Sequence, residues 1–231
     1  VQKCTQMFIS ERIRKDAIFP TGFKGSAAED GYIGANRQPE DELRRRATGI
    51  FFHWGQSIDV RDTRDPVLLA EAQRDCLERY RSRFEELHEA GFAVHIAPKL
   101  GVRECRRVKG EYVLTANDVT DGTMPDDTVA FARYNMDCWG IPEMIKVPTK
   151  QYGIPYRSLI PLSTDGLLTA GRVISGTRLA HSSYRVQRIC WHIGEAAGTA
   201  AAMAAIDRTG VRDIDVNELR QRLAGYGTIT L

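Results

Sequence analysis

The chain has 231 residues, of which 42% are hydrophobic and 27% charged, and its formal net charge at pH 7 is +2. This balance argues against nucleic acid or a membrane surface as a partner, and the longest apolar run, residues 198–206, is too short to cross a bilayer. The five cysteines lie far apart without a CxxC pair, so we expect neither a disulfide framework nor a metal site. Their isolation favours a reducing compartment, here the cytoplasm.

The N-terminal part is rich in residues that favour strands. Residues 5–9 and 49–54 are predicted to form strands, and the glycine-punctuated stretch 21–36 between them is predicted to be a loop. A long helix follows, with Asp65 as N-cap, Pro66 in the first helical position and Gly91 just past the end. Its apolar side chains recur at helical spacing: Leu69, Ala72, Cys76, Tyr80, Phe84 and Leu87.

The rest of the chain mixes strands and helices without a regular alternation. The fold class is therefore predicted as mixed α/β (α+β). The predicted segments are strands at 92–96, 111–115 and 129–137, a helical turn at 116–119, an extended edge at 152–159, a short buried strand at 166–170, a helix at 185–207, and a last helix that Asp215 and Glu218 open and Gly225 ends.

The most informative stretch is 167–203, LLTAGRVISGTRLAHSSYRVQRICWHIGEAAGTAAAM. Gly171 allows a sharp turn and a close approach of backbone to a ligand, and Arg172 follows it at the carboxyl end of the predicted strand. Residues 173–183 are predicted to be a polar loop that contains His181. The helix predicted to start near Ser183 and Arg185 would direct its N–H groups and positive dipole end at an anion. Its many Gly and Ala residues permit close backbone packing.

Three blocks in order, 98–119 (PKLGVRECRRVKGEYVLTANDV), 152–161 (YGIPYRSLIP) and 167–203, resemble the FAD-dependent oxidoreductase family. That family shares its plan with fumarate reductase flavoproteins and glutathione reductase-like two-dinucleotide-binding-domain flavoproteins. The resemblance covers about residues 40–230. It implies a flavoprotein with FAD as cofactor, which exchanges hydride with a small organic substrate. It also implies a substrate domain at 1–150, with a mixed sheet and helices, and the C-terminal strand and helix of an FAD-binding domain at 151–231.

The resemblance also implies roles for individual residues. The residues implied to contact the cofactor are Gly171, Arg172, Ser182, Ser183, Arg185 and Val186. His181 is the leading candidate for acid–base catalysis, because an imidazole suits proton transfer beside hydride transfer. A structural loop histidine is the alternative for this residue. Arg103 and Arg185 are candidates for clamping a substrate carboxylate.

The sequence departs from the family at one point, since a GxGxxG turn after an N-terminal strand is absent. We therefore expect the dinucleotide-binding fold to come from a missing segment or a companion chain, which makes a hetero-oligomer the expected state. The alternative is a non-catalytic scaffold or regulatory subunit that has kept the fold and lost the cofactor.

Overall fold

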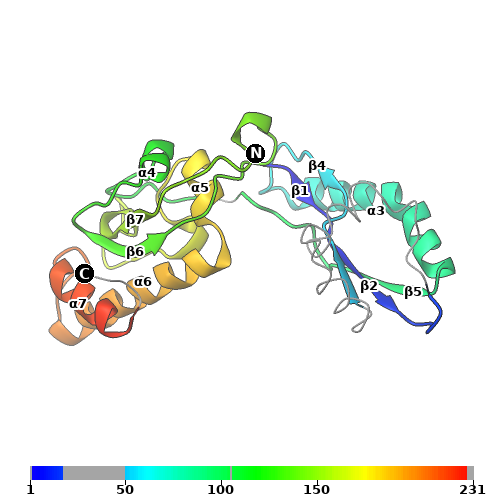
Figure 1. The fold of residues 1–231 in the computed structure, drawn as a ribbon. Helices are drawn as coiled ribbons and strands as arrows, with labels where there is room; N and C mark the ends of the chain where they lie inside the picture. Colours follow the sequence, from blue (N-terminus) through cyan, green and yellow to red (C-terminus); the bar gives the residue numbers. More distant parts are fainter. Residues whose placement is uncertain (1, 18–49, 105, 228–231) are drawn as a thin grey trace. The chain divides into compact units, whose positions relative to one another are not determined.

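The computed structural model describes residues 2–17, 50–104 and 106–227, which form two compact units, Val1–Arg103 and Glu104–Leu231 (Figure 1). The loop predicted at 21–36 lies outside the described residues. Helices accompany small antiparallel sheets, so the predicted mixed α/β (α+β) class is confirmed. Within the described residues, no helix is both long and apolar enough to cross a membrane.

In the described residues of the first unit, one long helix packs beside two small antiparallel sheets. Strand β1 (Cys4–Thr5) pairs with β4 (Ser57–Ile58), and the second sheet has the order β3-β2-β5. These three strands are β2 (Phe8–Arg12), β3 (Ile50–His53) and β5 (Phe92–Ile96). The strand predicted at 5–9 is thus wrong as one element. The strand is interrupted after Thr5, because the backbone N–H of Gln6 donates to the Gln56 carbonyl and its side-chain amide donates to the Ala97 carbonyl.

Helix α3 (Pro66–Glu89) confirms the helix predicted from the periodicity. Asp65 Oδ1 accepts from the backbone N–H groups of Val67 at 2.8 Å and Leu68 at 3.3 Å, which caps the N-terminus. Gly91 has a φ of 92°, a left-handed conformation that suits the residue after a helix. The buried face holds Ala72, Cys76, Tyr80 and Leu87, and part of it packs with Phe8 and Phe92 of the sheet.

In the part of the second unit that the structure describes, one antiparallel pair of strands packs with helices. Strand β6 (Thr128–Ala132) pairs with β7 (Tyr152–Pro155), and helices α6 (Gln187–Asp207) and α7 (Val216–Gly225) pack against β6 (Figure 1). The remaining elements are α4 (Ala116–Asp121), α5 (Arg178–Tyr184) and the 3₁₀ turns η1 (Pro142–Met144), η2 (Tyr156–Ser158) and η3 (Gly171–Val173). The division into a substrate domain at 1–150 and part of an FAD-binding domain at 151–231 stays a prediction. Strands β6 and β7, which lie on either side of residue 150, pair within the second unit.

Several short elements differ from those expected. Residues 111–115 do not form the predicted strand. Two isolated β-bridges occur here instead, between Gly110 and Pro161 and between Leu114 and Gly176. The strand predicted at 129–137 ends at Ala132. Residues 166–170 form no strand and are not buried. Leu167 is 45% exposed, and the Thr169 N–H donates to the Leu159 carbonyl, which also accepts the Thr169 hydroxyl.

The region before α6 is helical where a loop was predicted. Thr177 accepts a hydrogen bond from the Ala180 N–H and so caps α5, which carries His181 and both serines. The helix predicted to run from 185 begins at Gln187, because Val186 takes an extended conformation with ψ of 146°. In α7 the predicted cap is confirmed, since Asp215 Oδ1 accepts from the N–H groups of Asn217 and Glu218.

Candidate functional site

The turn at Gly171 lies beside α6 in the second unit. Gly171 has a φ of 67°, and the turn η3 that it opens packs against α6. A Cβ at this position would lie 3.7 Å from Cys190 Cβ, an ordinary contact. The backbone conformation, not lack of space, therefore requires glycine here. The sharp turn predicted from the sequence is confirmed.

Helix α6 starts without a side-chain cap. Val186 occupies the N-cap position, and its side chain accepts no hydrogen bond. In contrast, Asp65, Thr115, Thr177 and Asp215 cap the other four α-helices of the described residues with side-chain oxygens. The first N–H groups of a helix lack acceptors within it and carry its positive dipole end. This terminus therefore favours an anion or a polarised oxygen.

The two serines predicted to contact the cofactor are fully buried on α5. Ser182 Oγ donates to the Leu179 carbonyl at 2.7 Å. Ser183 Oγ donates to the Tyr134 carbonyl at 2.5 Å and lies 2.8 Å from the Tyr152 hydroxyl. Both hydroxyl groups are thus engaged within the protein, and their contact with a cofactor stays a prediction.

His181 is fully buried on the same helix, with its ring edge-on to Tyr184 at a centroid distance of 5.3 Å. Burial, followed in order of effect by the positive charges of Arg107, Arg185 and Arg172, lowers the pKa of His181 to about 3. The imidazole is therefore neutral at physiological pH. The structure brings three of the predicted site residues, His181, Arg185 and Arg172, into one electrostatic environment.

Arg185 connects the end of α5 to the loop after β6. Its Nη2 donates to the Asp137 carbonyl at 3.2 Å and lies 3.9 Å from the Asp137 carboxylate. Burial lowers the pKa of the Arg185 guanidinium, while Asp137 opposes this change. Trp139 Nε1 donates to the same carboxylate at 2.8 Å. Arg185 is thus held in place by a carboxylate that is itself fixed.

Arg103, the other predicted clamp residue, belongs to the first unit. Its Nη1 donates to the Lys3 carbonyl at 2.7 Å and to Thr5 Oγ1 at 2.6 Å, and its guanidinium lies 5.8 Å from the centroid of the Trp54 ring. These contacts hold it against β1. A role in binding substrate stays a prediction.

A sequence comparison then decides the family. The profile of the FAD dependent oxidoreductase family matches residues 9–223. The chain belongs to this family. Searches of curated proteins and of solved structures gave no significant match. The FAD-dependent oxidoreductase family gives the chain a flavin-dependent oxidoreductase-type function with FAD as cofactor, as the sequence blocks predicted.

Sequence patterns did not predict part of the polar environment in the second unit. Glu104 lies 3.6 Å from Arg107 and 3.2 Å from Arg178, and all three side chains are largely shielded from solvent. Nothing in the spacing of the sequence pointed to Arg178. Among the described residues, no group of three His, Cys, Asp or Glu side chains is placed to bind a metal ion.

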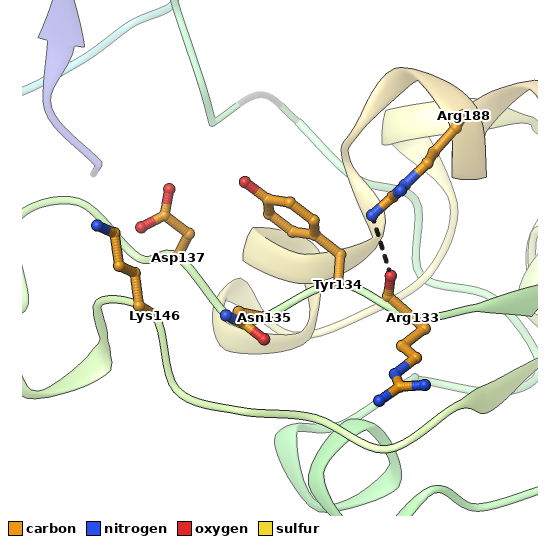
Figure 2. Close-up of a pocket in the computed structure, with 6 residues that line it drawn as sticks. All are labelled: Arg133, Tyr134, Asn135, Asp137, Lys146 and Arg188. Atoms are coloured by element: carbon orange, nitrogen blue, oxygen red, sulfur yellow. Dashed lines mark hydrogen bonds between the residues drawn. The ribbon is translucent and has the colours of Figure 1, made fainter. Parts of the chain in front are cut away.

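A pocket was also missed. It has a volume of about 540 Å³ and is lined by Arg133, Tyr134, Asn135, Asp137, Lys146 and Arg188 (Figure 2). Arg188 lies in the first turn of α6, so the lack of a capping residue at Val186 was a signal that could have directed attention to it. The other lining residues come from the loops around Asp137 and Lys146, whose proximity the sequence does not reveal.

Proposed function

We propose that this chain supplies the substrate-binding and FAD-closing part of a flavin-dependent oxidoreductase that exchanges hydride with a small organic substrate. The observation that carries the proposal is the left-handed turn at Gly171 packed against the uncapped start of α6. A backbone corner next to exposed N–H groups suits the pyrimidine edge of a flavin, where negative charge develops on reduction.

The residues of this chain fit one part of FAD better than the other. Gly171, Val186 and the first turn of α6 would hold the ring system. FAD, when bound, supplies hydride acceptance or donation at N5. The pyrophosphate ordinarily rests on a glycine-rich turn, and the 231 residues contain no GxGxxG. We infer that a further segment or a companion subunit contributes that turn.

The outer face of α6 supports this inference. Trp191 is 69% exposed and Ile206 is 73% exposed. Between them, Gly194 and Gly198 are exposed, and a Cβ at either would meet nothing within 4 Å. Apart from the exposed Glu195, this face consists of small and apolar residues, which is unusual for a solvent-exposed helix, where charged residues are expected. It suits close packing against another layer of the enzyme.

In this proposal, charge and proton are handled by separate groups. Arg185, fixed by Asp137, and the start of α6 stabilise negative charge beside the flavin. His181 is the proton acceptor. Its pKa of about 3 makes it a weak base in the described arrangement. Burial is the main cause of this low pKa, and a bound anion would raise it only by offsetting the smaller effect of the charges of Arg107, Arg185 and Arg172.

The test uses the native protein together with any polypeptide that copurifies. We expect a yellow complex whose flavin bands bleach when the correct substrate is added without oxygen. Gly171→Ala should weaken FAD binding at least tenfold, because a methyl group opposes the left-handed turn and the close approach of the flavin. Gly166→Ala is the matched control, since Gly166 also has a φ of 67° but no atom lies within 4 Å of its Cβ position. Equal FAD affinities for the two variants would contradict the proposal.

The alternative is a non-catalytic scaffold or regulatory subunit. It is favoured by the internal hydrogen bonds of Ser182 and Ser183 and by the complete burial of His181. A native complex that is colourless and takes up no added FAD would support this alternative. Flavin reduction by a substrate would exclude it.

A further inference from the structure

The pocket beside α6 has an unusual excess of positive charge. Arg133, Lys146 and Arg188 line it, and Asp137 is its one acidic lining residue. Trp139 and Arg185 engage only the Oδ2 atom of Asp137, and its Oδ1 atom is buried without a hydrogen-bond partner. Among the described residues, no carboxylate lies within ion-pair distance of the three lining cations. The pocket therefore has cationic groups whose counter-charge the described protein does not provide.

Other cations in the same unit contrast with this arrangement. Arg157, Arg178, Arg212 and Arg222 each pair with a carboxylate, at distances as short as 2.6 Å for Arg222. Such pairing is what surface arginines ordinarily do when acids are near. Three cations that line one cavity, with no described carboxylate within ion-pair distance, form a local concentration of positive charge.

Arg188 is held in a defined position. Its Nη2 donates to the Arg133 carbonyl at 3.3 Å, and its guanidinium lies 5.7 Å from the centroid of the Tyr134 ring. Figure 2 shows Arg188 directed toward Tyr134 and the Arg133 carbonyl, while the Arg133 guanidinium points the other way. The remaining Arg188 N–H donors are available to a ligand, and the positive end of the α6 dipole reinforces their charge.

Tyr134 and Lys146 are also fixed through their backbones. The Tyr134 carbonyl accepts the Ser183 hydroxyl hydrogen bond. Lys146 has a φ of 57°, which is uncommon for a residue other than glycine, and the next residue, Val147, exchanges two 3.0 Å hydrogen bonds with Met136. Strained backbone held by its surroundings is frequent at functional sites. In Figure 2 the Lys146 ammonium and Arg188 lie on opposite sides of the Tyr134 ring.

We propose that this pocket binds the oxyanion group, carboxylate or phosphate, of a small organic molecule. Arg188 and Lys146 supply the charge, and the Tyr134 hydroxyl donates a hydrogen bond. The volume of about 540 Å³ suits a small molecule rather than a polymer. The identification of this ligand as the substrate rests on the proposed oxidoreductase function. Binding of the oxyanion does not, because it needs no flavin chemistry.

The test is isothermal titration of the full chain, in separate experiments, with succinate and with inorganic phosphate at constant ionic strength. We expect saturable binding at one site. Arg188→Gln and Lys146→Asn should each weaken it at least tenfold, since each removes a charge-assisted contact. Asparagine tolerates the left-handed backbone at position 146. Tyr134→Phe removes the hydroxyl group but keeps the ring, and it should weaken binding several-fold. This variant tests the proposal if a charge variant fails to fold.

Lys150→Gln is the matched control, because Lys150 is an exposed cation of the same unit that does not line the pocket. It should bind as the unmodified chain does. Tighter binding of succinate would identify a carboxylate ligand, and tighter binding of phosphate a phosphorylated one. Failure of both probes to saturate, or an equal loss in Lys150→Gln and Arg188→Gln, would overturn the proposal. Either result would leave flavin reduction by substrate, the test of the proposed function, unaffected.

Discussion

Tyr152 in β7 and Ser183 in α5 are joined by a 2.8 Å hydrogen bond between their buried hydroxyl groups. Because Ser183 Oγ donates its hydrogen to the Tyr134 carbonyl, the Tyr152 hydroxyl is the donor to Ser183. Burial raises the pKa of Tyr152, which keeps this donor protonated. Ser183 therefore connects the sheet, the helix that carries His181, and the loop that lines the pocket of Figure 2.

Ser183→Ala should destabilise the protein more than Tyr152→Phe. The serine variant leaves a buried hydroxyl and a carbonyl without their partner, which costs about 1–3 kcal/mol of unfolding free energy. The phenylalanine variant removes one donor and leaves the Ser183–Tyr134 bond intact, at about 1 kcal/mol. Urea denaturation measures both values. Tyr226→Phe is the control, since Tyr226 is 65% exposed. A loss in Ser183→Ala no larger than in this control would contradict the inferred linkage.

His181 should make stability depend on pH. Its pKa is about 3 in the folded chain and about 6.5 when unfolded, so the unfolded state takes up the proton first as pH falls. Its contribution to stability is complete above about pH 6.5 and is lost progressively toward pH 3. The slope from one such group reaches about 1.4 kcal/mol per pH unit.

Urea denaturation between pH 4.5 and 7.5 measures this slope. His181→Gln should be less stable at pH 7.5 but should show a flatter dependence on pH. His88→Gln, a substitution on the exposed face of α3, should keep the slope of the unmodified chain. Identical slopes for His181→Gln and the unmodified chain would show that the histidine is not buried in the neutral form.

The outer face of α6 gives a prediction in which the stability of the isolated chain and the assembly of the native complex change in opposite directions. Alanine stabilises a helix interior by about 1 kcal/mol relative to glycine, and neither Gly194 nor Gly198 has an atom within 4 Å of its Cβ position. Gly194→Ala and Gly198→Ala should each stabilise the isolated chain by about that amount. If another layer packs on this face, the same methyl groups should weaken FAD retention or subunit association in the native complex.

Thermal unfolding of the isolated chain and gel filtration of the native complex separate the two effects. Gly225→Ala serves as the comparison, since this glycine also has open space at its Cβ position and belongs to a different helix, α7. It should change stability without changing association. Unaltered association in the α6 variants would contradict packing of a further layer on this face.

Local signals predicted much of this structure, and non-local pairing explains most of what they missed. The Asp65 and Asp215 caps and the Gly171 turn depend on neighbouring residues, and all three are as expected. The apolar run at 167–170 favoured a strand, but a strand needs a partner, and Thr169 has only the Leu159 carbonyl. Residues 178–184 became a helix because Thr177 caps them, a signal overlooked beside the glycines and serines.

The site shows the same division. The order of Gly171, His181 and Arg185 placed three candidate residues in one region, and the structure keeps them in the same unit. The partners that set their chemistry come from distant segments: Asp137 for Arg185, and Tyr152 for Ser183. A single sequence does not reveal which distant segments come into contact. The pocket cations were missed for this reason, since Lys146 and Arg188 come together only through the fold.

Glu104 gives the last prediction, because it is the acidic partner of two arginines. It lies 3.6 Å from Arg107 and 3.2 Å from Arg178, and its side chain is 13% exposed. Glu104→Gln would leave both guanidinium groups without this counter-charge. Since Arg178 keeps some contact with solvent, the expected loss is about 1–3 kcal/mol, below that for a fully buried pair.

Urea denaturation of Glu104→Gln and of Glu143→Gln, an exposed residue of η1 with the same change in charge, tests this value. Only Glu104→Gln should be clearly destabilised. Sulfate that binds between the two arginines should restore part of the loss, because a ligand of the folded state shifts unfolding by mass action. Sulfate should stabilise Glu143→Gln no more than the unmodified chain. An equal response of the two variants would show that Glu104 does not balance these arginines, and that their charges are neutralised by other groups.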